Sequence, residues 1–247
     1  MNPKAFVKNA MLQIEAFRKR DLGSKVFYYH DIHRSRPATS EMSTPLELFE
    51  SHLKVLEELG YDIVPTVTHP QGEAMITFDD GFTGLYDHFD FFVDRRLPVT
   101  LFMLSGRLGQ KRYLTKDQLL ELHRSGLVQI GSHTVDHHNL DELPAPKRLD
   151  EMRRSKETLE DLLGEEVSAF CYPRGRFNET IAREAATVGY KTQFSCLPGN
   201  YFDEVFPGVI RRNFVQHAGS AEFRAWALGG GMIFEKRFRH LHIRESA

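Results

Sequence analysis

The chain has 247 residues, a length that fits one large domain or two small ones and that an α/β barrel often takes as a single unit. Hydrophobic residues make up 41% of the chain and charged residues 27%, which is ordinary for a globular protein. The formal net charge of -2 gives no electrostatic reason to expect a nucleic-acid partner. With only two cysteines, Cys171 and Cys196, a disulfide framework is excluded.

The first segment, residues 3–20, has apolar side chains at helical spacing with basic residues between them, which predicts an amphipathic helix. We expect Phe6, Val7 and Met11 on this helix to pack against the rest of the domain, with contact to a partner or a membrane surface as the alternative. The segment lacks the apolar stretch and cleavage site of a secretory signal, and no window of the chain approaches a membrane span. We therefore expect a cytoplasmic protein with no transmembrane segment.

Beyond this helix, β-like runs alternate with helical patterns. The first run covers residues 25–30, and a helix over 46–59 follows a Ser-Thr-Pro boundary and ends at Gly60. Further apolar runs lie at 74–78, 99–104, 128–132, 168–172, 191–195 and 209–214, and helical patterns lie near 85–96, 115–125, 146–163, 179–188 and 220–228. This βαβ repetition predicts a single α/β domain with a parallel sheet.

The predicted organisation has three parts. Residues 1–24 form the N-terminal amphipathic helix, residues 25–228 form the α/β domain, and residues 229–247 form a C-terminal tail that begins at three glycines. The basic run at 236–240 in this tail is expected to be a solvated end of the chain rather than a binding patch.

Two adjacent carboxylates, Asp79 and Asp80, follow the apolar run at 74–78 directly and precede Gly81. Two like charges this close would raise the pKa of one carboxyl unless a cation or hydrogen-bond donors offset the second charge. A metal ion is the obvious cation. The alternative is an ordinary solvated turn, for which Asp-Asp-Gly is also a common sequence.

A second motif follows the run at 128–132, where His133 and His137 are spaced i and i+4. This spacing can direct two imidazole nitrogens at one ion, although such pairs also occur freely on surface helices. Both motifs come at the ends of apolar runs that are separated by enough chain for crossover helices. Both are therefore predicted to lie at the same end of one parallel sheet, which favours a metal site over two unrelated surface features.

Three motifs in order, Thr77-Phe78-Asp79-Asp80-Gly81, His133-Thr134-Val135-Asp136-His137 and Phe170-Cys171-Tyr172-Pro173-Arg174-Gly175, resemble those of the polysaccharide deacetylase (NodB-homology) family, carbohydrate esterase family four. The likeness spans roughly residues 25–228. The start Tyr29-His30-Asp31-Ile32 and the Tyr-Pro-x-Gly form of the third motif look most like the poly-N-acetylglucosamine deacetylase branch.

The resemblance implies a distorted (β/α)7-type barrel that holds a divalent ion through Asp80, His133 and His137. Zinc is the expected ion, with cobalt, nickel or manganese as alternatives. Asp79 would be the catalytic base, and the backbone N–H of Arg174 would stabilise the oxyanion. An Asp-His-His set is consistent with this role, because it leaves coordination positions open for water and a carbonyl oxygen.

The sequence departs from the family pattern at two points. Many family members have an arginine at the position of Cys171, where it pairs with the catalytic Asp, so that Arg174, Arg176 or Arg211 would have to supply the charge. The usual C-terminal Leu-x-His strand, which carries the general acid, is also not clear. His30 is the first choice for the acid because in the similar branch a permuted strand order brings this histidine in, and His242 and His217 are the alternatives.

Together these features predict a metal-dependent hydrolase that removes an N-acyl group, in the first place acetyl, from an amino sugar or saccharide. The alternatives are removal of formyl, another amidohydrolase activity of the same family, or a non-catalytic carbohydrate-binding relative, for which the Cys171 substitution is the supporting feature. A cytoplasmic enzyme would meet amino sugars as nucleotide-linked or lipid-linked precursors, so we expect a small activated saccharide or a short oligosaccharide as substrate.

Overall fold

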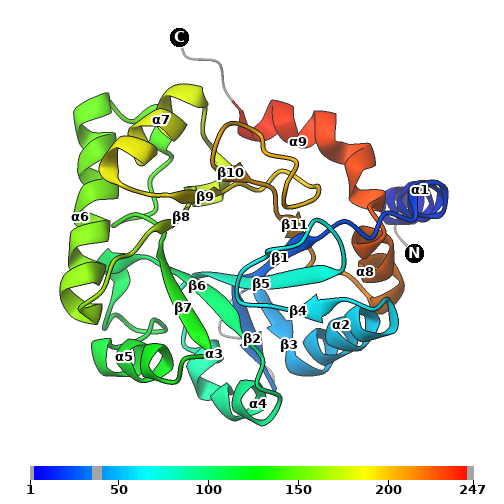
Figure 1. Ribbon diagram of the computed structural model, residues 1–247, viewed down its shortest axis with the longest axis horizontal. Coiled ribbons are helices and arrows are strands. Elements are labelled where there is room, and N and C mark those ends of the chain that lie inside the picture. The colour runs from blue at the N-terminus through cyan, green and yellow to red at the C-terminus, as the bar shows by residue number, and fades with distance from the viewer. Residues whose placement is uncertain (1–2, 35–40, 244–247) are drawn as a thin grey trace.

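The computed structural model describes residues 3–34 and 41–243. Within these ranges the chain folds around a curled parallel sheet with the strand order β10-β9-β8-β7-β6-β5-β1-β11, and β4 pairs with β5 beside this path (Figure 1). The strands are β1 (Lys25–Tyr29), β4 (Asp62–Ile63), β5 (Glu73–Asp80), β6 (Val99–Met103), β7 (Val128–Ser132), β8 (Ala169–Cys171), β9 (Thr192–Phe194), β10 (Val209–Ile210) and β11 (Asn213–Phe214). Two short strands, β2 (Asp31–His33) and β3 (Ser43–Pro45), pair separately.

One segment of chain joins the two edges of the curled sheet. The run predicted as a single strand at 209–214 is divided, so that β10 pairs with β9 at one edge and β11 pairs with β1 at the other. Arg211 and Arg212 occupy the gap between them. The sheet is a half-barrel in one α/β domain, which confirms the predicted distorted barrel.

Helices surround the sheet on its outer side (Figure 1). They are α1 (Pro3–Lys19), α2 (Leu46–Glu58), α3 (Gly84–Asp87), α4 (Phe89–Asp94), α5 (Lys116–Arg124), α6 (Ala145–Leu163), α7 (Glu179–Val188), α8 (Ser220–Ala227) and α9 (Glu235–His242), with 3-10 turns η1 (Ser105–Arg107), η2 (Leu140–Glu142), η3 (Pro173–Gly175) and η4 (Gly230–Phe234). The helix predicted over 85–96 is two short helices, because the backbone leaves helical geometry at His88.

The core between the sheet and the helices is rich in aromatic side chains. Phe49 on α2 contacts Tyr29, Phe78, Phe91 and Phe92, with ring centroids 5.0 to 6.0 Å apart. Rings at these separations add specific edge and offset contacts to the apolar burial. The packing of α2 and α4 against the sheet therefore explains part of the abundance of Phe in the sequence.

The N-terminal helix α1 packs against α8 and η4 through Leu12 and Ala16, which are buried. The expectation that Phe6, Val7 and Met11 pack against the domain is wrong, because these side chains are exposed. Leu12 and Ala16 already occupy the contact, and the three other side chains lie on a different face of the helix. Within the described ranges, no helix combines the length and apolarity needed to cross a membrane.

The C-terminal tail of the prediction contains η4 and α9. At the last residue of α9, the carbonyl of His242 accepts a hydrogen bond from the backbone N–H of Phe177, at 3.0 Å. Ile243 forms a parallel bridge with Phe177 and packs against the apolar cluster around it. This part of the chain is therefore attached to the domain at the third sequence motif.

Candidate active site

The register of three neighbouring strands brings the first two motifs together. Asp80 at the end of β5 lies opposite Met103 of β6, and Met103 lies opposite Ser132 of β7. His133 follows Ser132, and its backbone N–H donates to the Met103 carbonyl at 2.9 Å. The carboxyl ends of parallel strands thus place the aspartates and histidines at one rim of the barrel, as predicted.

Asp79 is buried and paired with a resident cation, Arg212. The two guanidinium Nη atoms donate to the two carboxylate oxygens at 2.7 and 2.9 Å, and Arg212 has no exposed surface. Burial alone would raise the pKa of Asp79, but the charge and hydrogen bonds of Arg212 hold it well below its ordinary value. Asp79 is therefore ionised at neutral pH.

Asp80 has the opposite surroundings. Its Oδ1 atom is buried and accepts no hydrogen bond from any residue that the structure describes. Oδ1 lies 3.6 Å from His133 Nε2 and 3.7 Å from His137 Nε2, and the three ligand atoms lie within 4.8 Å of one another. Burial raises the pKa of Asp80. A buried carboxylate oxygen without a donor is costly, so this position fits a cation.

The two histidines have the protonation state that a metal ligand needs. Burial lowers the pKa of His133, and it lowers the pKa of His137 to about 3, so both rings are neutral near pH 7. His133 Nδ1 pairs with the Cys171 carbonyl at 2.8 Å, which directs the lone pair of Nε2 toward Asp80. The chemistry of this donor set therefore fits a divalent ion of the zinc type.

Several residues of the site have a strained backbone conformation. Asp80, Thr134, His137 and Arg174 all have positive φ angles, between 54° and 75°, although none is a glycine. Such conformations cost about 1–3 kcal/mol each and persist where the surroundings impose them, often at functional sites. Glu151 on α6 supports the histidine loop, because its carboxylate accepts the backbone N–H groups of residues 135 and 136 at 3.0 Å.

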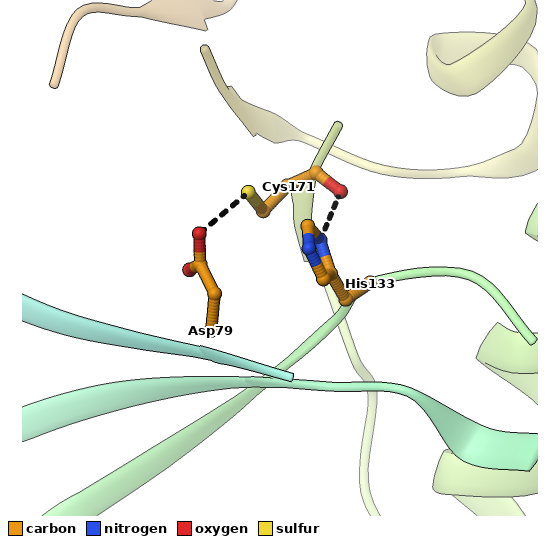
Figure 2. Close-up of side chains that lie close together, drawn as sticks. All are labelled: Asp79, His133 and Cys171. Carbon is orange, nitrogen blue, oxygen red and sulfur yellow. Dashed lines mark hydrogen bonds between the residues drawn. The ribbon is translucent and has the colours of Figure 1, made fainter. Parts of the chain in front are cut away.

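A second group, Asp79, His133 and Cys171, also brings three metal-binding atom types within 4.8 Å (Figure 2). Its charge is already balanced, because Arg212 binds both Asp79 oxygens and lies 2.8 Å from Cys171 Sγ. Burial also raises the pKa of the Cys171 thiol well above its ordinary value, which keeps the thiol protonated. Of the two groups, Asp80 with His133 and His137 is the better match to a metal ion.

The histidines considered as general acid occupy different positions. His30 follows β1, whose Tyr29 is paired with Phe78 of β5, so His30 lies next to the aspartates. Its Nδ1 lies 2.7 Å from Gln216 Oε1, and an amide oxygen only accepts, so Nδ1 carries a proton and the other ring nitrogen faces away from Gln216. His217 contacts the amide nitrogen of the same glutamine, at 2.9 Å.

His242 contacts the backbone of the third motif. Its Nδ1 is 3.0 Å from the carbonyl oxygen of Arg174, which orients the ring toward the backbone of η3. Arg174 is the residue proposed for the oxyanion contact, and its side chain is exposed.

The sequence interpretation missed the arginine that pairs with Asp79. It considered Arg174, Arg176 and Arg211, and the structure contradicts all three. Arg176 instead pairs with Asp141 and Glu142, and Arg211 donates to the backbone and to Glu235. The sequence did contain a signal for Arg212. In an extended segment, side chains two residues apart point to the same side, and Ile210 faces the barrel interior, so Arg212 is expected to face it too.

Comparison with known proteins agrees with this geometry. The family model described as Polysaccharide deacetylase matches residues 66–193, just over half of the chain. The chain belongs to the polysaccharide deacetylase family. YxkH of Bacillus subtilis (strain 168), which is named for this family, is 30% identical over 188 residues, covering 70% of this chain and 64% of that protein.

More distant relatives include poly-beta-1,6-N-acetyl-D-glucosamine N-deacetylases of Staphylococcus aureus. The one from strain MRSA252 is 21% identical over 57% of this chain and 55% of its own length. The chain thus spans less than two thirds of the curated relatives it matches. Among solved structures, IcaB from Ammonifex degensii superposes with a TM-score of 0.70 at 24% identity, covering 84% of this chain and 98% of that chain, which supports the same fold.

Proposed function

We propose that this deacetylase-family chain is a metal-dependent hydrolase that removes an N-acyl group, in the first place acetyl, from an amino sugar. One observation carries the proposal. Two adjacent carboxylates have opposite surroundings, with Asp79 ionised beside Arg212 and Asp80 directed at two neutral histidines. Amide hydrolysis needs such a pair, because a proton acceptor must stand beside an electrophilic centre.

Asp80, His133 and His137 would hold the ion, for which zinc is the first choice and cobalt, nickel or manganese are alternatives. When bound, a divalent ion supplies Lewis-acid polarisation of the amide carbonyl and lowers the pKa of water.

Asp79 acts as the proton acceptor for the attacking water. Because Arg212 lowers the pKa of Asp79, the carboxylate stays ionised and can accept a proton, but it is a weak base. It would therefore act on water acidified by an ion held at Asp80, and a carboxylate oxygen of each aspartate lies within 4.8 Å of a nitrogen atom of His133. The replacement of the family arginine by Cys171 was the feature that favoured a non-catalytic relative. Arg212 weighs against that alternative, because it supplies the positive charge that Cys171 lacks.

His30 protonates the leaving amine, which cannot depart as an anion. The hydrogen bond from Nδ1 to Gln216 fixes the ring and leaves Nε2 to carry the transferred proton. The backbone N–H of Arg174 stabilises the negative oxygen that develops on the carbonyl carbon. The positive φ of Arg174 orients this peptide group in a way that an ordinary turn would not.

The substrate is proposed from the relatives. A deacetylase that acts on poly-N-acetylglucosamine is among them, so an N-acetylated amino sugar is the class of substrate we propose. Within this class, a short or activated saccharide remains the preference drawn from the sequence, as does a cytoplasmic location.

Release of free amine from N-acetylglucosamine oligomers and from nucleotide-linked N-acetylglucosamine tests the proposal directly. Purified protein would be stripped of metal and reloaded with Zn²⁺, with N-formyl sugars and simple peptide amides as parallel substrates. We expect amine release from an N-acetyl sugar that depends on added metal. Release from none of the N-acyl sugars by the loaded protein, or release only from peptide amides, would refute it.

A further inference from the structure

An apolar stripe runs along the exposed side of α1. It consists of Phe6, Val7, Ile14 and Phe17, whose exposed fractions are 63%, 55%, 62% and 80%. Separations of 7, 8 and 11 residues place these side chains on one side of a helix, and Met11 lies at the edge of the stripe with an exposed fraction of 40%. A row of large apolar side chains on one exposed helix face is unusual for a surface that meets only water.

The helix cannot rotate to bury this stripe, because its opposite face is already fixed. Leu12 and Ala16 are buried against α8 and η4. At Gly230 the backbones approach so closely that an added Cβ would lie 2.5 Å from the carbonyl oxygen of Leu12. Lys8 also pairs with Glu222 of α8 at 2.6 Å. Figure 1 shows α1 at the outer edge of the helical layer, beyond α8.

The charge around the stripe is basic. Arg18, Lys19 and Arg20 follow at the C-terminal end of α1 and are exposed, and Glu15 is the one acidic residue in the helix sequence. Glu15 lies 3.7 Å or more from the nearest basic nitrogen atoms, at Arg18 and Lys19, so it neutralises the end of the helix only in part. An apolar face bordered by basic side chains is the pattern of helices that lie in the surface of an anionic membrane.

A second copy of this chain is a poorer occupant for the stripe. In a two-fold pair the same surface meets itself, so Arg18, Lys19 and Arg20 would face a helix whose one acidic residue is Glu15. Lipid headgroups with negative charge would instead complement Arg18, Lys19 and Arg20 while the acyl region takes the apolar side chains. We propose that α1 docks this domain on the surface of an anionic lipid bilayer through the apolar stripe.

Co-sedimentation with vesicles tests this proposal. Full-length protein would be mixed with vesicles of phosphatidylcholine alone or of phosphatidylcholine with phosphatidylglycerol. We expect binding to the mixed vesicles that weakens at high salt, because the basic contribution is screened. Ile14→Glu and Phe17→Glu should each lower the partition coefficient by roughly tenfold, since each removes one inserted apolar side chain.

Phe202→Glu is the matched control, because Phe202 is an equally large side chain with an exposed fraction of 50% outside α1. It should bind as the parent does. Melting temperature and amine release from a small substrate should stay unchanged in all three variants, which separates loss of docking from loss of folding, and Phe17→Ser is the milder substitution if Phe17→Glu fails to fold.

Three outcomes would overturn the proposal. They are absence of binding to anionic vesicles, binding that neither stripe variant reduces, and a dimer in analytical ultracentrifugation that Phe17→Glu dissociates. The last result would assign the stripe to a second copy.

Discussion

The two halves of the candidate site carry the same kind of residue in opposite surroundings. Asp79 is bound by a guanidinium that the chain itself supplies, with both carboxylate oxygens satisfied at 2.7 and 2.9 Å. Asp80, the next residue, has a buried oxygen with no donor among the described residues and two neutral imidazoles facing it. The chain therefore provides one of the two cations that the pair of carboxylates requires.

This difference explains how adjacent carboxylates can divide the work of one site. Two buried negative charges side by side would push one pKa upward and neutralise that group. Arg212 keeps Asp79 charged without the need for a bound ion, which is consistent with the proposed role of Asp79 as proton acceptor. Among the described residues Asp80 Oδ1 has no hydrogen-bond donor, which supports the proposal that Asp80 is a metal ligand. Substitutions in each half should therefore have separable consequences.

The largest effect is expected at Asp79. Asp79→Asn preserves shape but removes the proton acceptor, and a general base is typically worth about 10²–10⁴-fold in rate. We expect kcat to fall by about that factor while the metal content of the purified protein stays at the parent level. Turnover close to that of the parent would place the base elsewhere.

Arg212→Met should be the most destabilising change at the site. It leaves the Asp79 carboxylate buried without its cation, and breaking a buried pair in this way costs about 3–5 kcal/mol. Urea unfolding at pH 7 would measure the loss. The double variant Asp79→Asn with Arg212→Met removes both charges and should be more stable than Arg212→Met alone; if it is not, the pairing of these two residues does not account for the cost.

A smaller effect, about 10²-fold in kcat, is expected for His30→Ala, because the leaving amine loses its proton donor. His242→Ala is the control, since His242 is a histidine that contacts the backbone of Arg174 rather than Gln216. It should lower kcat little. The reverse ranking would transfer the acid role to the C-terminal histidine.

Removal of metal should have the smallest effect on stability. A free metal concentration of 100 times the Kd stabilises the folded state by about 2.7 kcal/mol. Treatment with a chelator should therefore lower the melting temperature, and added Zn²⁺ should restore it. His133→Ala combined with His137→Ala should melt at the same temperature with and without Zn²⁺. Stabilisation of that variant by Zn²⁺ equal to that of the parent would place the ion outside this group.

The sequence predicted the part of the site that is local in the chain. The Asp-Asp and His-x-x-x-His motifs each follow a strand, and the parallel arrangement of strands brings their ends together, so adjacency could be inferred from the order of elements. Arg212 and Gln216 were missed because their partners, Asp79 and His30, lie more than 130 residues away in the chain. Alternation from Ile210 could have indicated that Arg212 rather than Arg211 turns inward, but not that its partner is Asp79.

The N-terminal helix illustrates a different limit. Its amphipathic pattern predicted the helix, but the apolar residues form two faces, one with Leu12 and Ala16 and one with the apolar stripe. Only the first face meets the domain. Periodicity indicates that an apolar face will be buried somewhere, and it does not say which of two faces the domain covers.

Metal stoichiometry in Asp79→Asn and Asp80→Asn is the most direct test of the central claim. The two substitutions are chemically identical, adjacent, and each removes one negative charge from the same site. We expect one equivalent of divalent metal in the parent protein and in Asp79→Asn, and none in Asp80→Asn, measured by elemental analysis after reloading with Zn²⁺. Loss of metal from Asp79→Asn with retention in Asp80→Asn would contradict the account and assign the ion to Asp79, His133 and Cys171 instead.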